Sequence, residues 1–527
     1  MKNKKKSYNY LVVFLLFILI YVLLLCALVL FEKGNPASSI HTFADAVWFS
    51  LATLSTVGYG DITPVTPMGH VIGVVFLLLS MGVLVALFGS VVSVLTSEGL
   101  PMMKLRLMRK KNWYYMAEFT SESDAFAKDI LREDKDAVII YGVNREKEIE
   151  KPDYPCLYIN VSPARIVAHK KGIGSKCKLF FLVENDIGNN LKAVDVHKLD
   201  ADVYACTTSG QEKMSGNVHF FHTYDCCARS YWRENPLSNT DDMIVLLGFE
   251  NYGMALLERA ILTNVSNCDI EVQYHVFGDS RKFRQIHTNL NQIFGINERM
   301  PGQDSIYFHE EDWTNAHDII SKADRIIICE DKEDAGWDDL WQIQRYYEYK
   351  GRIYLRSSHE QAPRVRYFGT NDQIFTVNQI IRTRLNDAAR MMNDLYRRSV
   401  TDSLDWDDLG DRLRQSKIAA ADHLFMKVRV LLGTGKVQTL DREICMAAYE
   451  ALLKAKKDPE LVDRFRRIEH TRWMRFYSYY NWRYGKKHNG RLREDPKMRR
   501  YESLSEDEKK YFDRAWDLLG ELTQQMK

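Results

Sequence analysis

Two long runs of apolar residues lie in the first hundred positions, and the rest of the chain alternates short apolar and polar stretches. The first run covers residues 10–31 and the second covers about residues 70–95. Each is long enough to cross the hydrocarbon core of a bilayer as a helix. The stretch 42–55 between them is too short to span and suits a re-entrant helix. The pattern therefore predicts an all-α membrane pore over residues 1–97, with two spans and a pore helix.

Basic residues flank the outer ends of both runs. A group of lysines near the N-terminus precedes the first run, and the segment 98–111 after the second carries five basic residues. Basic segments stay on the cytoplasmic side of a membrane, so both termini are expected in the cytoplasm and residues 32–69 outside. A signal peptide has a similar basic start, but this apolar run is too long for one. Residues 98–111 are predicted to be a basic linker.

The predicted pore helix is followed directly by the segment Thr56-Val57-Gly58-Tyr59-Gly60-Asp61. A potassium ion that sheds its water must be held by rings of backbone carbonyl oxygens from four chains. Successive carbonyls can face one axis only if the backbone alternates into left-handed conformations, which Gly58 and Gly60 adopt without steric cost. Asp61 would attract cations at the outer mouth. We therefore predict a selectivity filter, with K⁺ bound by the carbonyls of Thr56, Val57, Gly58 and Tyr59.

Together with Trp48, Thr53, Pro64 and Gly69 around the filter, residues 10–97 resemble the two-transmembrane-helix potassium channel family. The resemblance implies a homotetramer in a lipid bilayer, with potassium ions in the filter as the bound cofactor.

One departure from this family lies behind the filter, where many bacterial relatives carry a carboxylate and this chain has Ala52. Asp61 is expected to bond the indole of Trp48 instead, as in other potassium channels. In the inner helix, Gly82 is the candidate gating hinge, because glycine weakens a helix locally. Close packing between helices is the alternative role for this glycine.

From residue 112 onward the chain alternates short apolar strands with helical patterns, and this rhythm restarts at Met243. Alternating strands and helices predict a parallel sheet. Two α/β Rossmann-like lobes in tandem are therefore expected, over 112–236 and 241–398. In order and pattern they resemble the regulator-of-potassium-conductance domains that form gating rings beneath such pores.

The glycine-rich turn of the second lobe, residues 248–253, departs from a dinucleotide-binding turn. Such a turn needs glycine at its third position so that the backbone can approach the pyrophosphate. Here Glu250 occupies that position, and the first lobe has no glycine in the equivalent turn, 118–123. Asp279 could hold a ribose, although a lone aspartate more often caps a helix. We expect no NAD in either lobe.

The last region, 402–527, is predicted to be mainly α-helical. Its Glu469-His470-x-x-Trp473 motif, followed by Trp482-Arg483-Tyr484-Gly485, resembles the bacterial form of the ryanodine-receptor repeat domain. The resemblance implies a ligand sensor, with nucleotide-derived signals as the expected ligands. Trp482 and Tyr484 follow the helix in a basic loop, where they suit a flat anionic ligand or a packed core equally well. The candidate ligand-binding residues are Glu469, His470, Arg472, Trp482, Arg483 and Tyr484.

Composition also limits the kinds of partner, metal site and reaction that are expected for this chain. The net charge of +2 over 527 residues gives no indication of a nucleic-acid partner. The nine cysteines form no CxxC pair, which favours reduced, structural thiols rather than zinc ligands. No nucleophile–base set is recognisable, so the chain is not expected to be an enzyme.

These features predict a potassium-selective channel in a bacterial plasma membrane, gated by a small nucleotide-like cytosolic ligand through a gating ring. One alternative is a bacterial defence channel that depolarises the membrane when a nucleotide messenger binds. Another is a regulatory subunit of a separate potassium transporter, although such a subunit would need no filter. The sequence leaves open the identity of the ligand and whether it opens or closes the pore.

Overall fold

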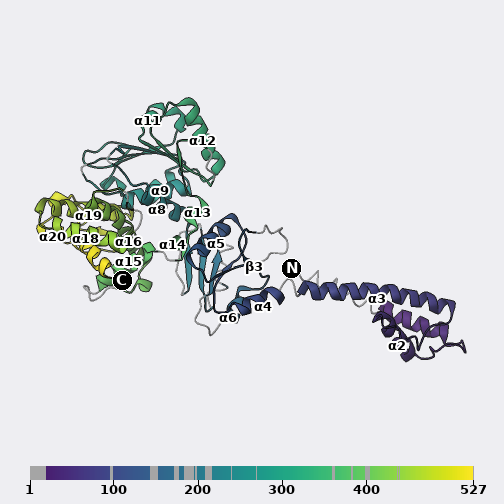
Figure 1. Ribbon diagram of the computed structural model, residues 1–527. Helices are drawn as coiled ribbons and strands as arrows, with labels where there is room; N and C mark the ends of the chain where they lie inside the picture. Colours follow the sequence, from purple (N-terminus) through teal and green to yellow (C-terminus); the bar gives the residue numbers. More distant parts are fainter. Residues whose placement is uncertain are drawn as a thin grey trace. The chain divides into compact units, whose positions relative to one another are not determined.

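The computed structural model (Figure 1) divides into two compact units, Met1–Met108 with Tyr158–Asn160 and Arg109–Leu157 with Val161–Lys527. The residues it describes are 19–94, 99–142, 152–170, 177–182, 195, 199–207, 217–238, 240–268, 270–358, 362–381, 384–397, 404–435, 437 and 440–525.

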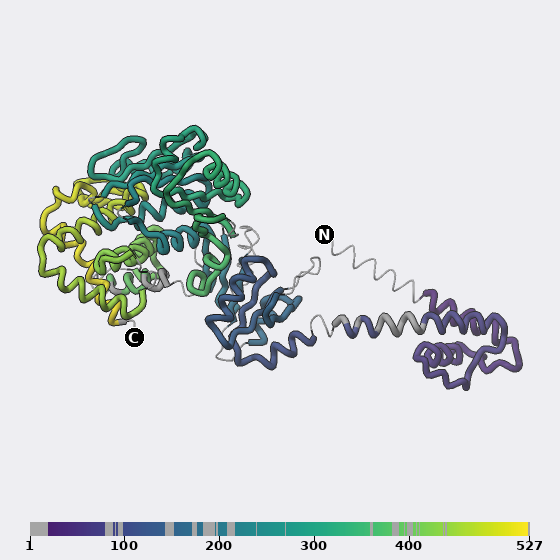
Figure 2. The backbone as a smooth tube through the Cα atoms, turned by 45° about the horizontal axis from the view of Figure 1, so that its top comes forward, coloured from purple at the N-terminus to yellow at the C-terminus, as the bar shows by residue number. Residues whose placement is uncertain are grey.

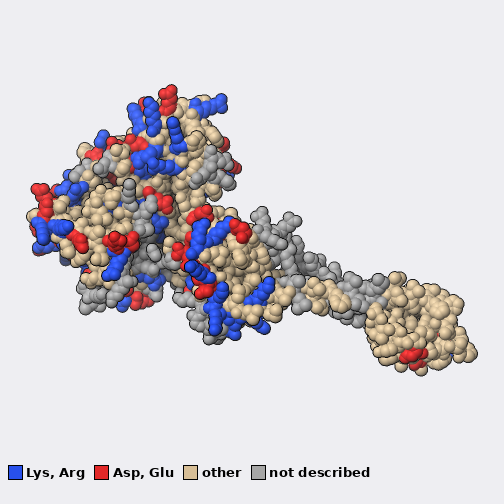
Figure 3. All heavy atoms as spheres, viewed as in Figure 1, with Lys and Arg blue, Asp and Glu red and all other residues tan. Residues whose placement is uncertain are grey.

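The first unit is helical. Residues 19–32 form a helix, followed by α2 (Phe43–Leu54), α3 (Pro67–Val94) and α4 (Leu100–Leu107). Apolar side chains from the first three helices and the intervening loop make its core: Leu25, Leu28, Ile40, Ala46, Phe49, Ile72 and Phe76. The face seen in Figure 3 carries almost no charged side chains around α2 and α3.

The two predicted membrane spans stay a prediction. The run 10–31 lies partly outside the described residues, which begin at residue 19. Within the part of the chain that is described, no helix has the length and apolar character needed to cross a membrane.

The second unit contains two parallel sheets, as the alternating pattern predicted. The first sheet has the strand order β3-β2-β1-β4-β5-β6, the order of a Rossmann-like fold. Strands β2 and β4 are mostly buried apolar runs, which is typical of parallel sheets covered on both faces. The elements of this lobe are β1 (Asn112–Met116), α5 (Ser121–Glu133), β2 (Ala137–Tyr141), β3 (Cys156–Tyr158), α6 (Pro163–Lys170), β4 (Cys177–Phe181), β5 (Asp202–Cys206), β6 (Val218–Phe221) and α8 (Thr223–Glu234).

The second sheet has the order β13-β12-β11-β7-β8-β10-β9. Helices α11 and α12 lie over one face of it and α8 and α9 lie on the other (Figure 1). Its elements are β7 (Met243–Leu247), α9 (Asn251–Thr263), β8 (Gln273–Phe277), α10 (Arg281–Ile286), η2 (Leu290–Gln292), β9 (Gly295–Ile296), β10 (Ser305–His309), η3 (Trp313–Asn315), α11 (His317–Lys322), β11 (Arg325–Ile328), α12 (Glu333–Tyr346), β12 (Arg352–Arg356), β13 (Val365–Phe368), α13 (Asn371–Ile374) and α14 (Val377–Ile380).

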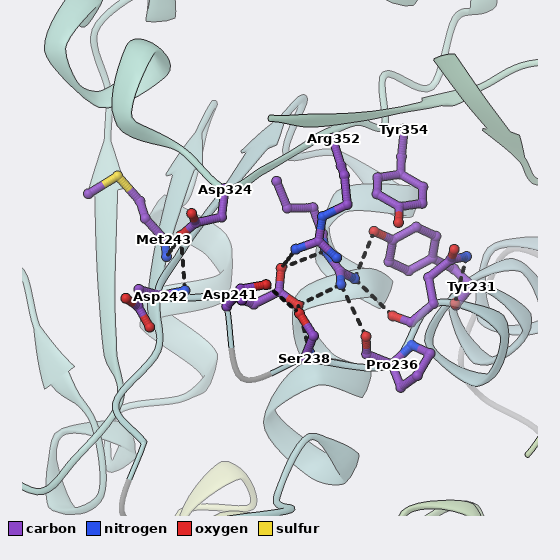
Figure 4. A network of polar contacts seen from close by, with 12 residues as sticks. Tyr231, Pro236, Ser238, Asp241, Asp242, Met243, Asp324, Arg352 and Tyr354 are labelled. Carbon is purple, nitrogen blue, oxygen red and sulfur yellow. Dashed lines mark hydrogen bonds and ion pairs between the residues drawn. The ribbon is translucent and has the colours of Figure 1, made fainter. Parts of the chain in front are cut away.

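The segment that joins the two lobes is fixed by a buried ion pair (Figure 4). Arg325, at the start of β11, and Asp241 are 1% and 0% exposed, and their Nη2 and Oδ2 atoms lie 2.8 Å apart. Arg325 also donates to the backbone carbonyls of Asn235 and Pro236. A charged side chain of the second lobe, Arg325, therefore holds the segment that follows α8. These polar contacts join the two lobes.

The C-terminal region is mainly helical, as predicted, and packs beside the second lobe (Figure 2). Arg475 Nη2 lies 2.6 Å from Asp304 Oδ2, and His423 Nε2 lies 2.8 Å from the Val265 carbonyl. Its elements are α15 (Arg384–Arg397), η4 (Trp406–Asp408), α16 (Asp411–Asp422), α17 (Leu424–Leu432), α18 (Arg442–Ala455), α19 (Pro459–Tyr479), β14 (Arg483–Tyr484), β15 (Glu494–Asp495), η5 (Tyr501–Ser503), α20 (Glu506–Lys510) and α21 (Arg514–Gln525).

Candidate functional site

The predicted filter segment, residues 56–61, has the alternating backbone that carbonyl coordination of an ion would require. The φ angles of Thr56, Gly58 and Gly60 are +60°, +57° and +73°. Sequence reasoning anticipated this for the two glycines but not for Thr56, a residue type that rarely takes a positive φ. The amides of Val57 and Gly58 both donate to the Ala52 carbonyl, at 3.1 and 3.0 Å, and so tie the segment to the end of α2.

Aromatic side chains support the outer side of this segment. The indole of Trp48 donates to Asp61 at 3.0 Å, as expected from the absence of a carboxylate at position 52. Trp48 also stacks on Tyr59, with ring centroids 5.8 Å apart and an interplanar angle of 8°. Tyr59 remains 67% exposed and Val57 54% exposed in the single chain. These apolar side chains leave a surface that further copies of the chain could cover.

A buried glutamate binds the loop between the predicted filter segment and α3, and no local motif in the sequence marks it. Glu32 is 0% exposed and accepts hydrogen bonds from the Thr66 amide and hydroxyl, at 2.8 and 2.6 Å. Gly69 lies against this carboxylate, since an added Cβ would come within 2.0 Å of Glu32 Oε1. The predicted hinge, Gly82, falls within α3, but its surroundings lie outside the described residues.

Carboxylates of the protein fill the glycine turn of the second lobe. Asp331 accepts from the Asn251 side chain at 2.7 Å and from the Tyr252 amide at 3.2 Å, at the N-terminus of α9. Gly248 has a φ of +88°, and a Cβ there would lie 2.7 Å from the Glu330 carboxyl carbon. In a dinucleotide site this helix end faces the pyrophosphate. Glu250, the residue that sequence reasoning singled out, is exposed beside these two acids.

Glu330 gives this acidic turn a pH dependence. Burial, then the charges of Asp339 and Glu250, raises the pKa of Glu330 to about 7, compared with 4.5 for an ordinary glutamate. A carboxyl with a raised pKa in the folded state destabilises the fold as the pH rises between these two values. Glu330→Gln is therefore expected to increase the free energy of unfolding at about pH 8 more than at about pH 5, by on the order of 1 kcal/mol.

Urea denaturation at the two pH values tests this expectation. Glu348→Gln is the matched control, because Glu348 is an exposed glutamate of the same lobe. Equal stabilisation of Glu330→Gln at both pH values would contradict the assignment.

In the C-terminal region, the structure pairs two of the candidate ligand residues with each other. Arg472 Nη2 lies 2.7 Å from Glu469 Oε1, and Lys427 Nζ lies 2.8 Å from Glu469 Oε2. Burial alone would raise the pKa of Glu469, but Arg472 and Lys427 lower it to about 2. Glu469 is thus ionised, and its two carboxylate oxygens already form ion pairs with Arg472 and Lys427 of the protein itself.

His470 is buried beside this ion cluster. It is 3% exposed, and its Nε2 lies 3.2 Å from the Lys497 carbonyl. Burial lowers the pKa of His470 to about 4, so its ring is neutral near neutral pH. Among the residues that are described, no group of histidine, cysteine and acidic side chains is arranged to hold a metal ion.

Trp482 is a core residue, which corrects its placement in an open basic loop with Tyr484. It is 1% exposed and belongs to the same buried cluster as Trp473. Tyr484 is 50% exposed, and Arg483 is a surface residue that pairs with Glu494 at 2.9 Å. The chain turns sharply after α19, with a φ of +59° at Asn481, and this turn directs Trp482 back onto the helix. Helical spacing could not reveal such a reversal.

The burial of Trp482 predicts a large effect on stability. Trp482→Ala should lower the free energy of unfolding by about 3–5 kcal/mol, because it removes a large buried ring. Tyr484→Ala should change it by less than about 0.5 kcal/mol, as is usual for surface sites. Urea denaturation followed by circular dichroism measures both, and equal effects of the two changes would contradict this placement.

The structure also shows a charged junction that sequence reasoning missed. Arg259 on α9 lies 2.7 Å from Asp225 on α8 and 3.2 Å from Asp422 on α16. Arg229 on α8 reaches the same Asp422 at 2.9 Å. These four side chains join both lobes to the C-terminal region. No local motif marks them, because the partners lie up to 193 positions apart in the sequence.

Comparisons with known proteins agree on the first unit. Residues 11–97 match the family model described as "Ion channel". The chain is 43% identical over 65 residues to a voltage-gated potassium channel of Aeropyrum pernix, a match covering 12% of this chain and 22% of the relative. It is 38% identical over 81 residues to two pore potassium channel c of Oryza sativa subsp. japonica, covering 15% and 18%. The N-terminal region is therefore an ion channel domain similar to potassium channels, and it spans less than a quarter of these relatives.

Among solved structures, the chain resembles the GsuK channel bound to ADP, with 14% identity and a TM-score of 0.33. That alignment covers 70% of this chain and 96% of the other. A structure of the GsuK channel bound to NAD gives 12% identity and a TM-score of 0.30, with 71% and 83% covered. Scores this low establish neither a shared fold nor a shared ligand.

Proposed function

We propose that this chain is one subunit of a homotetrameric, potassium-selective channel that a cytosolic ligand gates. The observation that carries the proposal is the filter segment, where Thr56, Gly58 and Gly60 all have positive φ and Trp48 braces Asp61. One chain supplies only one wall of a pore, and carbonyl rings for potassium need four. The exposed Val57 and Tyr59 side chains support the presence of further copies.

The proposed channel lies in a bacterial plasma membrane, with both termini on the cytoplasmic side. The tandem lobes act as a gating ring, and the C-terminal region, with its resemblance to ryanodine-receptor repeat domains, senses a nucleotide-like ligand. The ion pairs among Asp225, Arg259 and Asp422 support coupling between the C-terminal region and the lobes, because a movement of α16 would also displace α8 and α9. A ligand can gate the pore only if it binds the open and closed states differently.

The second lobe is proposed to serve as scaffold rather than as an NAD site. Asp331 and Glu330 support this, since both carboxylates lie where a bound pyrophosphate would need space and positive charge. Calorimetry with NAD and NADH tests the point on the purified protein. Micromolar binding that Asp331→Asn alters strongly would overturn it.

Reconstitution in vesicles tests the channel itself. Purified protein should carry potassium in preference to sodium, and mass measurement in detergent should give four chains per particle. Reversal potentials that do not follow the potassium gradient, or a stable dimer or trimer, would disprove the proposal.

A further inference from the structure

Cationic and aromatic side chains gather at one place inside the C-terminal region, and they come from separate elements. We call this group the cation–aromatic cluster; it consists of Tyr396 on α15, Arg412 and Lys417 on α16, Arg472 and Tyr477 on α19, Trp482, and Arg514 on α21. From this group, the candidate ligand-binding residues predicted from the sequence included Arg472 and Trp482 only.

Cation–ring contacts hold the members together. The Lys417 ammonium lies 4.0 Å from the centre of the Tyr396 ring, and the Arg514 guanidinium lies 5.0 Å from the same ring. The Arg412 guanidinium lies 5.0 Å from the Trp482 ring. Such contacts stabilise a cation only modestly compared with a carboxylate partner.

Positive charge is in excess within the cluster. Among the described residues, no carboxylate forms an ion pair with Lys417. Burial, together with the nearby Arg514 and Arg472, lowers the pKa of Lys417 to about 8. Glu469 is the carboxylate that contacts the cluster through Arg472, and Lys427 already shares it. Folding therefore places the Lys417 ammonium close to two guanidinium groups, with no carboxylate paired to it among the described residues.

Hydrogen-bond donors in the cluster also lack acceptors. Within the described part of the chain, the Trp482 Nε1, Arg472 Nη1 and Arg412 Nη1 atoms are buried without a hydrogen-bond partner. Trp482 and Arg472 are 1% and 4% exposed, so bulk water does not satisfy them. Burial raises the pKa of the Tyr477 hydroxyl, and the nearby charges of Arg412 and Arg472 both act to lower it. Buried donors without acceptors are costly and rare in folded proteins.

We propose that the cation–aromatic cluster is the binding site for the phosphate groups of the gating ligand. A polyanion would accept hydrogen bonds from the donors of Trp482, Arg472 and Arg412 that lack acceptors, and it would neutralise the Lys417 ammonium. This assignment rests on the proposed function for its role in gating. The binding itself is independent of the pore and can be tested without it.

The cluster also has a signature in stability that a purely structural role would not share. Lys417→Met keeps the length of the side chain and removes the charge, so it relieves repulsion from Arg472 and Arg514 in the empty protein. The variant should melt at a higher temperature than the native protein and yet bind phosphate ligands more weakly. A lysine kept only for packing would lose stability, or show no change, on the same substitution.

Calorimetry on the full-length protein in detergent tests the site, with ATP, inorganic pyrophosphate and adenosine as probes. ATP and pyrophosphate should bind saturably and adenosine should not. Lys417→Met should weaken both phosphate probes by about tenfold or more, the usual effect of losing one charge-assisted contact. Lys457→Met is the matched control, because Lys457 is an exposed lysine of the same region, and it should bind like the native protein.

Two outcomes would overturn the proposal: no saturable binding of ATP or pyrophosphate to the native protein, or equal binding by Lys417→Met and the native protein. Potassium flux in vesicles separates this result from the channel function. Flux without phosphate binding would contradict the proposed site but not the channel function. Phosphate binding without flux would contradict the channel function but not the proposed site.

Discussion

Gly58→Ala is expected to abolish potassium flux while the protein still assembles. Gly58 has a φ of +57°, in the left-handed region where an alanine side chain costs about 1–2 kcal/mol per residue. Four copies would surround one pore, so the strain would be repeated in every subunit of the filter. An alanine that relaxed to negative φ would turn its neighbouring carbonyls away from the ion path.

The loss of flux expected for Gly58→Ala comes from backbone strain and not from a steric clash. A Cβ built on Gly58 meets no atom within 4 Å in the single chain. Gly34→Ala is therefore a close control, since Gly34 is equally uncrowded but has no positive φ. Flux assays on reconstituted protein should show loss of conduction for Gly58→Ala and native flux for Gly34→Ala. A conducting Gly58→Ala channel would exclude a carbonyl filter at this segment.

Local features of the sequence predicted the parts of the structure that depend on local physics. The glycines of the predicted filter meet a requirement for positive φ at single positions. The hydrogen bond from Trp48 to Asp61 joins residues only 13 positions apart. The buried apolar strands of both sheets repeat a pattern that is visible along the chain. Such features can be inferred from spacing, because the residues that cause them lie close together in sequence.

The features that sequence reasoning missed depend on contacts between distant segments. Asp331 caps α9 from 79 positions away, and no spacing rule links it to Tyr252. Trp482 was open to either interpretation until the reversal at Asn481 placed it in the core. The cation–aromatic cluster combines four helices, so its excess charge is apparent only after those helices have packed.

The buried pair of Asp241 and Arg325 predicts a large loss of stability in the second unit when one partner is removed. Asp241→Ala would leave Arg325, 1% exposed, without its carboxylate. Its remaining partners would be two backbone carbonyls and the Tyr231 hydroxyl. Removing one member of a buried ion pair costs about 3–5 kcal/mol, because the remaining charge stays buried and uncompensated. The amide and hydroxyl of Ser238 would also lose their acceptor.

Asp242→Ala is the matched control, since Asp242 is the next residue along the chain and is exposed. It should change the free energy of unfolding by less than about 0.5 kcal/mol. Urea denaturation of the full-length protein should separate the two variants clearly. The double variant Asp241→Leu with Arg325→Met should recover part of the loss, because it removes the buried Arg325 charge together with its partner. Arg352, which also pairs with Asp241, is 30% exposed, so water can solvate its charge. If Asp241→Ala unfolded at the same urea concentration as Asp242→Ala, the pair would not be what holds the joining segment to the second lobe.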